Sequence, residues 1–556
     1  MLKRLKSVSM MLFLMGASTG AAYAVSNPGI TDVKIAQQDG ACTGIVKDAT
    51  GETVIGASVV VKGTTNGTIT GIDGDFSLSN VKKGDVIVIS FVGYISQEIV
   101  WDGKPVNVTL KDDTQTLDEV VVVGYGTQKK VNVTGAVGMV DSKVIAARPV
   151  QNVSQALQGV IPGLNLTVGN SGGSLDGEMN INIRGTGTIG DGSGSSPLVL
   201  IDGIEGNLNT VNPNDIESVS VLKDAASASI YGARASFGVI LVTTKSGKSG
   251  KTNVNYSGNV RFNDAIGIPE LMDSYTFAQY FNRASSNRGG GDIFSPAVME
   301  RIKAYQEGTL TATTVDNGSG IWQKWANANG NTDWFGEFYD NWVPSQEHNL
   351  SISGGTEKLQ YVLSGSFLDQ KGLLRHGTDK FQRYTLNSKI TANITDWLKV
   401  TLNSKWTRED FQRPTYLTSS FFHNLARKWP VHPAYDPNGF PMDEGEIEQM
   451  ENGGEQNSQK DYYTNQLHVV IEPIKNWRIN LEGSVRTTTQ YQHWEVLPVH
   501  AYDVNGDPYY TVWDMGYGSY SAGSSRVDEY SWKENYYTTN IYSDYFKQFD
   551  NGHYFK

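Results

Sequence analysis

From Thr252 onward, apolar and polar side chains alternate along the chain with a period of two. The first stretch sets Val254, Tyr256, Gly258, Val260 and Phe262 against Asn253, Asn255, Ser257, Asn259 and Arg261. A period of two gives a β-strand one apolar and one polar face. The pattern returns at residues 350–352, 359–367, 384–394, 398–406, 467–471, 479–485 and 535–546. It predicts about eight antiparallel strands of a membrane barrel, whose wall separates lipid from a polar lumen.

The connections between these stretches differ in length in a regular way. Tight turns at residues 355–358, 395–397 and 473–477 alternate with long connections at 264–346, 407–460 and 487–534. Short turns on one side and long loops on the other are typical of outer-membrane barrels. Beyond the N-terminal 24 residues, no apolar run approaches the ~20 residues of a membrane helix. The sequence therefore predicts a mainly β protein with an incomplete transmembrane antiparallel β-barrel.

Residues 1–24 have the pattern of a signal peptide. Lys3, Arg4 and Lys6 precede a mostly apolar run, and Ala22-Tyr23-Ala24 is a small-x-small cleavage site. Removing this segment removes three basic and no acidic residues, which takes the formal charge from −12 to about −15. An exported chain with this much negative charge is a poor nucleic-acid binder, because neutralising phosphates needs clustered Lys and Arg.

The sequence contains no recognisable catalytic or metal-binding motif. Cys42 is the one cysteine, so no internal disulfide can form. The eight histidines have no zinc-binding spacing. We therefore predict no catalytic residue, no metal and no cofactor, and we do not expect an enzyme.

Residues 25–41 are predicted to be a leader, and residues 42–112 a small all-β sandwich. Its short β-branched segments lie at 43–46, 57–62, 76–78, 86–92 and 106–110, with Gly and Asp turns between them. The following run, DEVVVVGY, comprises Asp118, Glu119, Val120, Val121, Val122, Val123, Gly124 and Tyr125. Such an extended run can pair with the sheet edge of another protein. Alternatively, it is an eighth strand of the sandwich.

Residues 130–250 are predicted to be a compact α+β unit. Strands are expected at 179–184, 197–202, 216–222 and 239–244, and helices at 150–160 and 225–231. A unit of this size can fill a barrel of about twenty-two strands, but not one of eight. We therefore expect the 556 residues to be a fragment that contains only the first part of its barrel.

Three stretches resemble the plug signature of SusC/RagA-type TonB-dependent transporters: IRGTG at 183–187, LVLIDGIEG at 198–206, and residues 214–248. DEVVVVGYG resembles the Ton box of that family, and residues 44–78 are similar to its carboxypeptidase-regulatory-like domain. The resemblance implies an order of domains: signal peptide 1–24, leader 25–41, regulatory-like domain 42–112, Ton box and linker 113–129, plug 130–250, and barrel 251–556.

The resemblance also implies a function. Family members import glycans or oligopeptides across the outer membrane, with a SusD-like lipoprotein over the extracellular mouth. TonB, energised by ExbB–ExbD, binds the Ton box in the periplasm, and the barrel lies in the lipid bilayer. Two other functions stay open: a signalling receptor and a secreted β-rich adhesin. The sequence does not name the substrate.

Two sets of site residues follow from the resemblance. Residues 118–125 are expected to contact TonB. The plug motif supplies five charged candidates for ion pairs that latch the plug to the barrel wall: Arg184, Asp202, Lys223, Asp224 and Arg234. The same motifs contain Gly185, Gly203, Tyr231, Gly232 and Gly238, where the glycines suit tight turns. Ordinary surface ion pairs are the alternative for the charged set.

Aromatic residues cluster in the long connections, at Trp322, Trp325, Trp334, Phe335, Phe338, Tyr339, Trp342, Phe421, Phe422 and Trp429. Aromatic faces can stack on sugar rings. Packing within the loops, or an interfacial girdle, is the interpretation we favour.

Overall fold

A computed structural model describes residues 40–64, 66–91, 94–111, 120–123, 126–129, 136–148, 150–168, 174–185, 196–511, 513–514, 519–520, 522–549 and 554–555. The chain divides into two compact units, residues 1–119 and 120–556. Each unit is described by itself.

The first unit is a β-sandwich, as predicted. One sheet has the order β4-β1-β7 and the other the order β3-β2-β5-β6. The strands are β1 (Gly40–Lys47), β2 (Ser58–Val61), β3 (Gly67–Ile69), β4 (Asp75–Val81), β5 (Val86–Ser90), β6 (Gln97–Val100) and β7 (Val106–Thr109). Cys42 is fully buried in the core between the sheets, next to residues such as Val46 and Leu78. Its thiol is therefore a small apolar core group.

The second unit begins with a two-stranded hairpin of β8 (Val120–Val123) and β9 (Gly126–Lys129). An α+β unit at residues 136–248 follows, here called the plug. Its main sheet has the order β10-β15-β16-β13-β14, and β11 and β12 form a separate hairpin. The strands are β10 (Val137–Asp141), β11 (Leu164–Val168), β12 (Met179–Ile183), β13 (Leu198–Ile201), β14 (Ile204–Glu205), β15 (Ile216–Leu222) and β16 (Val239–Thr244).

The helical segments of the plug are short. They are α2 (Ser142–Ala146), α3 (Val153–Leu157), η2 (Leu208–Thr210), η3 (Pro213–Asp215), α4 (Ala225–Ala228) and η4 (Ser229–Ala235). The helix predicted at 150–160 is thus only α3, because Asn152 caps its start and Gly159 has a positive φ of 73° just beyond its end. The predicted strands at 216–222 and 239–244 match β15 and β16.

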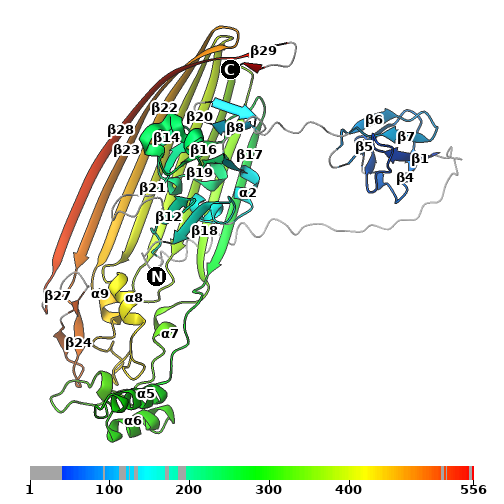
Figure 1. The fold of residues 1–556 in the computed structure, drawn as a ribbon. Coiled ribbons are helices and arrows are strands. Elements are labelled where there is room, and N and C mark those ends of the chain that lie inside the picture. Colours follow the sequence, from blue (N-terminus) through cyan, green and yellow to red (C-terminus); the bar gives the residue numbers. More distant parts are fainter. Residues whose placement is uncertain are drawn as a thin grey trace, which may run out of the picture. The chain divides into compact units, whose positions relative to one another are not determined.

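The rest of the second unit is dominated by an eight-stranded antiparallel sheet, here called the wall, in which sequential strands pair throughout (Figure 1). Its strands are β17 (Gly250–Asn263), β18 (Val343–Gly355), β19 (Leu359–Lys371), β20 (Lys380–Thr395), β21 (Leu398–Pro414), β22 (Glu455–Ile474), β23 (Trp477–Val496) and β28 (Arg526–Tyr545). Their apolar side chains point away from the plug and are exposed, for example Val254 (62%), Leu386 (57%) and Ile541 (72%). Polar residues such as Arg383, Asn387 and Asn403 are buried instead. In a soluble protein the apolar residues are buried and the polar ones exposed. The reverse is typical of a barrel wall, whose outer face contacts lipid and whose inner face contacts polar groups.

The strands are longer than predicted, so the long connections shrink to residues 264–342, 415–454 and 497–525. The loops predicted at 407–460 and 487–534 were too long at both ends. The prediction ended each strand where the alternation of apolar residues ended, but the strands continue beyond that point. Strands β22 and β23 have 20 residues each. That length corresponds to roughly 66 Å, against ~30 Å of hydrocarbon. Their outer halves stand beyond the lipid and need no apolar face.

At this end of the wall, the connections fold into small structures of their own (Figure 1). They contain α5 (Ser274–Asn287), α6 (Pro296–Gln306), η5 (Trp325–Asn327), α7 (Trp334–Phe338), α8 (Ser419–Leu425), α9 (Ile447–Asn452), β24 (His500–Tyr502), β25 (Pro508–Tyr510), β26 (Trp513–Asp514) and β27 (Ser519–Tyr520). A last hairpin pairs β29 (Lys547–Gln548) with β30 (Tyr554–Phe555). Among the described residues, no helix is both long enough and apolar enough to cross a membrane.

Candidate functional site: the plug–wall interface

Asp202 lies at the turn between β13 and β14 and connects the plug to the wall. Its carboxylate forms an ion pair with Lys405 of β21 and lies 3.6 Å from Lys389 Nζ of β20. Asn403 Nδ2 donates to Oδ2 at 3.0 Å. On the plug side, the backbone N–H of Thr244 donates to Oδ1 at 2.9 Å and its hydroxyl to Oδ2 at 2.7 Å. The carboxylate is therefore bonded from both bodies at once.

The turn that presents Asp202 requires unusual backbone angles. Asp202 has a φ of +50° and Gly203 one of +86°. Only short polar residues and glycine adopt such angles readily. The Asp-Gly pair of the LVLIDGIEG stretch therefore places the carboxylate against the wall.

Burial alone would raise the pKa of the Asp202 carboxyl, because the charged form loses its hydration. The positive charges of Lys405 and Lys389, with hydrogen bonds from Lys405 and Thr244, outweigh that effect and hold the pKa well below its usual value. Asp202 is therefore ionised at neutral pH. Removing its charge would leave two partly buried lysines uncompensated.

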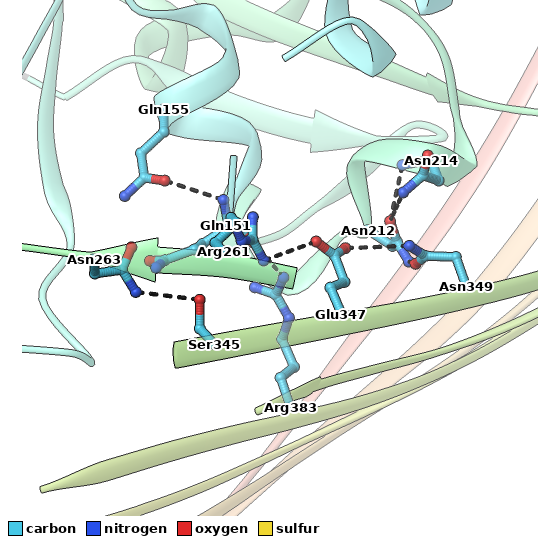
Figure 2. Close-up of polar contacts among 10 residues, drawn as sticks. All are labelled: Gln151, Gln155, Asn212, Asn214, Arg261, Asn263, Ser345, Glu347, Asn349 and Arg383. Atoms are coloured by element: carbon cyan, nitrogen blue, oxygen red, sulfur yellow. Dashed lines mark hydrogen bonds and ion pairs between the residues drawn. The ribbon is translucent and has the colours of Figure 1, made fainter. Parts of the chain in front are cut away.

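A second connection runs through Arg383 of β20, which is only 4% exposed (Figure 2). Its guanidinium donates to two plug carbonyl oxygens, that of Asn209 at 2.7 Å and that of Gln151 at 2.5 Å. The hydroxyl of Thr407, on β21, donates to the carbonyl of Thr210 at 3.0 Å. Two wall strands thus hold the plug segment around η2 by its main chain.

Next to Arg383, a polar row on β17 and β18 continues the interface (Figure 2). Glu347 accepts from Arg261 Nη2 at 3.1 Å and from Asn349 Nδ2 at 3.4 Å. Asn349 in turn accepts a hydrogen bond from Asn212 of the plug. Glu347 and Asn349 are both buried. The side-chain oxygen of Asn349 thus has this partner only while the plug is in place, whereas Glu347 is bonded within the wall.

A third connection surrounds Glu205 of β14. Arg486 of β23 donates to its carbonyl oxygen. Its carboxylate accepts from Arg234 Nη1 at 3.0 Å, and Arg234 also donates to the hydroxyl of Tyr536 on β28 at 3.2 Å. The Arg234–Glu205 pair is largely exposed, so its contribution to stability is small.

The structure separates the five charged latch candidates into two groups. Asp202 and Arg234 reach the wall. Asp224 instead caps α4 through Ser227 N at 2.8 Å and accepts from Ala136 N at 2.6 Å, so it connects elements within the plug. The described contacts of Lys223 and Arg184 also lie within the plug, where their backbone N–H groups donate to Ala136 and Gly163.

The uncharged motif residues serve the backbone of the plug. Gly185, Gly203, Gly232 and Gly238 all have positive φ, as tight turns require. At Gly238 a Cβ would lie 2.8 Å from the Leu222 carbonyl oxygen. Tyr231 packs on the core cluster that contains Leu222 and Val239.

The wall residues that bond to the plug were not predicted from the sequence. Lys389, Arg383 and Lys405 stand in strands that were identified only by their apolar residues. A signal was present, because a long cation in the lumen-facing register of a barrel strand needs an anion or a carbonyl inside the lumen. The plug residue that supplies it is set by three-dimensional packing.

Of the predicted Ton box, Asp118, Glu119, Gly124 and Tyr125 lie outside the described residues. Val120–Val123 form β8, which pairs with β9 and belongs to neither sheet of the sandwich. Val120–Val123 are therefore not an eighth strand of the sandwich.

The loop aromatics largely pack within the long connections, as favoured above. Trp334, Phe338 and Phe421 are fully buried in one cluster, and Phe277, Phe281, Phe294 and Trp429 form another. Trp342 is an exception and is 70% exposed.

Comparisons with known proteins agree with this architecture. The TonB-dependent Receptor Plug Domain family matches residues 129–239, and the CarboxypepD_reg-like domain family matches residues 42–122. The TonB-dependent receptor SusC of Bacteroides thetaiotaomicron is 37% identical over 375 residues, which cover 65% of this chain and 33% of that protein. The TonB-dependent receptor P39 of Formosa agariphila is 33% identical over 393 residues, covering 70% of this chain and 34% of that protein.

Solved structures show the same fold. The RagAB peptide importer in its 'open-open' state superposes with a TM-score of 0.60 at 24% identity, covering 78% of this chain and 47% of that chain. Its 'closed-closed' state gives a TM-score of 0.58 at 22% identity, covering 75% and 46%. The chain spans about a third of the length of the curated relatives it matches.

A plug held inside a wall with an apolar outer face defines a TonB-dependent receptor of the outer membrane. Proteins of this class are transporters rather than enzymes. Within the class, the chain belongs to the SusC/RagA family.

Proposed function

We propose that the protein imports a large nutrient, an oligosaccharide or an oligopeptide, across the outer membrane by TonB-dependent transport. The observation that carries the proposal is the polar plug–wall interface around Asp202. An apolar interface would expose hydrophobic surface to water each time the plug moved. Ion pairs and carbonyl hydrogen bonds can be exchanged for water, so a plug held by them can move and return.

We assign the Ton box to residues 118–125 within a linker at 113–129. β8 has one edge paired with β9, and its other edge can accept a further strand. Pairing through main-chain groups gives TonB a grip that does not depend on particular side chains. The same assignment places the sandwich, residues 42–112, in the periplasm, and takes residues 130–250 as the plug and 251–556 as wall and loops.

We assign the latch to Asp202 with Lys389 and Lys405. These buried ion pairs would resist a force applied to the linker. Replacing them with hydrogen bonds to water would release the plug. Arg383 and Glu347 are further members of the interface, and Glu205 with Arg234 forms its exposed rim.

A SusD-like lipoprotein is the proposed partner at the end of the wall that carries the long connections. That end holds the buried aromatic clusters, which give the connections a folded surface rather than loose loops. RagAB, whose fold the chain shares, is a peptide importer, so peptides stay among the proposed substrates.

The test is uptake in the bacterium that carries the gene. Deleting the gene should abolish growth on one polymeric or oligomeric nutrient as sole source, and deleting tonB should have the same effect. Growth of the deletion strain on every such nutrient would reject the import proposal. Changed gene expression with normal uptake would favour the signalling alternative.

A further inference from the structure

Three cavities lie in a row along the interface between the plug and the wall. The first, of about 1010 Å³, opens at the end of the wall where the long connections begin. The second, of about 140 Å³, has three lining residues in common with the first: Leu175, Gln370 and Gln456. The third, of about 320 Å³, has three in common with the second: Glu178, Asn207 and Lys460. Cavities that share lining residues adjoin, so the three form one path.

Strand β22 lines all three cavities. Side chains of a strand alternate between its two faces, and those that β22 turns to the path are all polar: Gln456, Ser458, Lys460, Tyr462 and Thr464. The next residue on the same face, Gln466, donates through Nε2 to the carbonyl oxygen of Asp202 at 3.0 Å. The path therefore runs from the end of the wall that carries the long connections to the latch.

The third cavity borders the latch itself. Lys405 and Thr244 both line this cavity, and both bond to the carboxylate of Asp202. Lys405 keeps 18% of its side-chain surface exposed, against 8% for Asp202. A small molecule in the cavity can therefore reach the side chain of Lys405 while the plug is in place.

Lys460 indicates what fills the path. Its side chain stands where the second and third cavities adjoin. Among the described residues, no carboxylate lies within 4.0 Å of its ammonium group, and no protein atom accepts a hydrogen bond from that group. An ammonium ion withdrawn from bulk solvent needs acceptors for its three N–H groups. Water molecules in the adjoining cavities supply those acceptors.

The path is too narrow for a nutrient. Its smallest cavity, of about 140 Å³, has room for several water molecules at ~30 Å³ each. Pockets for small organic ligands usually measure about 300–1,000 Å³. The lining of the smallest cavity also places charges of both signs close together, with Glu178 and Glu409 facing Arg383 and Lys460. Such a lining binds water well.

We infer that a chain of water molecules follows the inward face of β22 and hydrates the latch before TonB pulls on the linker. The inference rests on the proposed import function and specifies how the latch of that function is released. In a dry interface, the ion pair of Asp202 and Lys405 would have to break before water could replace it, which would leave buried charges unpaired. With water already beside Lys405, each lost contact is exchanged for one to water as it breaks.

The experiment is hydroxyl-radical footprinting of the purified full-length protein in detergent. X-rays generate the radicals from water, including water held inside the protein, and mass spectrometry measures the oxidation of two tyrosines. Tyr462 lines the third cavity, whereas Tyr416 is 3% exposed within an apolar cluster. We expect Tyr462 to be oxidised at least roughly fivefold faster than Tyr416, because only Tyr462 has water beside it.

Ser458→Leu should close the path, because it places a larger apolar side chain in the smallest cavity. Oxidation of Tyr462 should fall to the level of Tyr416. The initial rate of tonB-dependent uptake should fall at least roughly threefold, because the latch then exchanges its contacts without water. Thr464→Leu fills the third cavity instead and should have the same two effects, which covers the case that Ser458→Leu does not fold.

Matched controls are Ser458→Ala, which leaves the cavity open, and Asn457→Leu, which places the same leucine on the outward face of β22. Both should keep the parental oxidation and uptake rates. A heat-mobility gel checks that every variant is folded.

Equal oxidation of Tyr462 and Tyr416 in the parental protein would overturn the inference, and so would oxidation of Tyr462 that the folded filling variants leave unchanged. Normal uptake by a variant whose Tyr462 is no longer oxidised would overturn it as well, because water would then have no part in release. Failure of the import proposal is distinguishable from these results. In that case the parental strain would show no tonB-dependent growth on any nutrient, whatever the oxidation of Tyr462.

Discussion

The ammonium group of Lys405 forms an ion pair with the carboxylate of Asp202, although the two residues stand 203 positions apart in the chain. One belongs to the middle of a wall strand and the other to a tight turn of the plug. Both side chains are largely withdrawn from water, with 18% and 8% of their surface exposed. This pair, together with Lys389, fastens the plug to the wall.

Asp202→Asn should loosen the plug. The variant leaves Lys389 and Lys405 without their anion, and breaking a buried ion pair from one side typically costs about 3–5 kcal/mol. We expect the outer membrane to become permeable to large antibiotics that the closed plug excludes, which vancomycin sensitivity measures. Glu217→Gln is the control, because Glu217 pairs at 4.0 Å with the exposed Lys248. That exposed pair should contribute about 0–1 kcal/mol. Equal vancomycin sensitivity of the two variants would contradict the latch.

Val122→Pro should block energised uptake without preventing insertion of the protein. Val121 is hydrogen-bonded to Gln128 of β9, so the N–H of the next residue, Val122, points to the other edge of β8. Proline at Val122 removes that donor, and an added strand then pairs poorly. Uptake of the nutrient should fall to the level of a tonB deletion, while the amount in outer-membrane fractions stays normal. Val122→Ala keeps the N–H and should transport normally. Transport by the proline variant at the parental rate would remove residues 118–125 from the proposed TonB contact.

The sequence predicted the faces of the wall better than its contacts. A period of two specifies which residues of β17 or β20 point outward, because lipid accepts only apolar groups there. It also indicated the short turns, such as the one between β18 and β19. It did not indicate how far each strand continues, since beyond the lipid the outward face of β22 is free to be polar.

Of the interface, only the plug side was accessible to sequence reasoning. Asp202 was singled out because it stands in a turn motif, but so were Lys223 and Asp224, whose described contacts lie within the plug. The choice between them depends on which turn faces Lys389 and Lys405. That relation comes from the packing of two separately folded bodies, and no local pattern encodes it.

Gly247→Ala should disturb the passage of the chain from plug to wall. A Cβ at Gly247 would overlap the backbone of Tyr361, lying 2.6 Å from its carbonyl oxygen and 2.8 Å from its carbonyl carbon. Backbone cannot yield as a flexible side chain can, so we expect a cost of about 1–3 kcal/mol from overpacking. The fraction of heat-modifiable protein in outer membranes should fall. Gly291→Ala, at a site where a Cβ meets nothing within 4 Å, should leave that fraction unchanged. Full assembly of Gly247→Ala would show that the chain at residue 247 can move away from β19 at little cost.

Acidification should loosen the folded connections at the end of the wall, through His432. This residue is fully buried: its Nδ1 accepts from Trp325 N at 3.4 Å, and its Nε2–H donates to the Asp443 carbonyl at 3.1 Å. Both partners suit the neutral ring. Burial, then the charges of Lys428 and Lys324, lower the pKa of His432 well below 6.5.

The sign of the effect follows from that pKa. An unfolded His432 takes up a proton below about pH 6.5, and the folded residue does not. Its contribution to stability is therefore complete above pH 6.5 and falls by about 1.4 kcal/mol for each unit of pH below it. Amide exchange in residues 324–334 and 428–446 of the full-length protein, corrected for intrinsic rates, should be faster at about pH 5 than at about pH 7.5. His432→Asn cannot titrate, so its exchange should show little of this dependence. Equal acceleration in both proteins would mean that a group other than His432 is responsible.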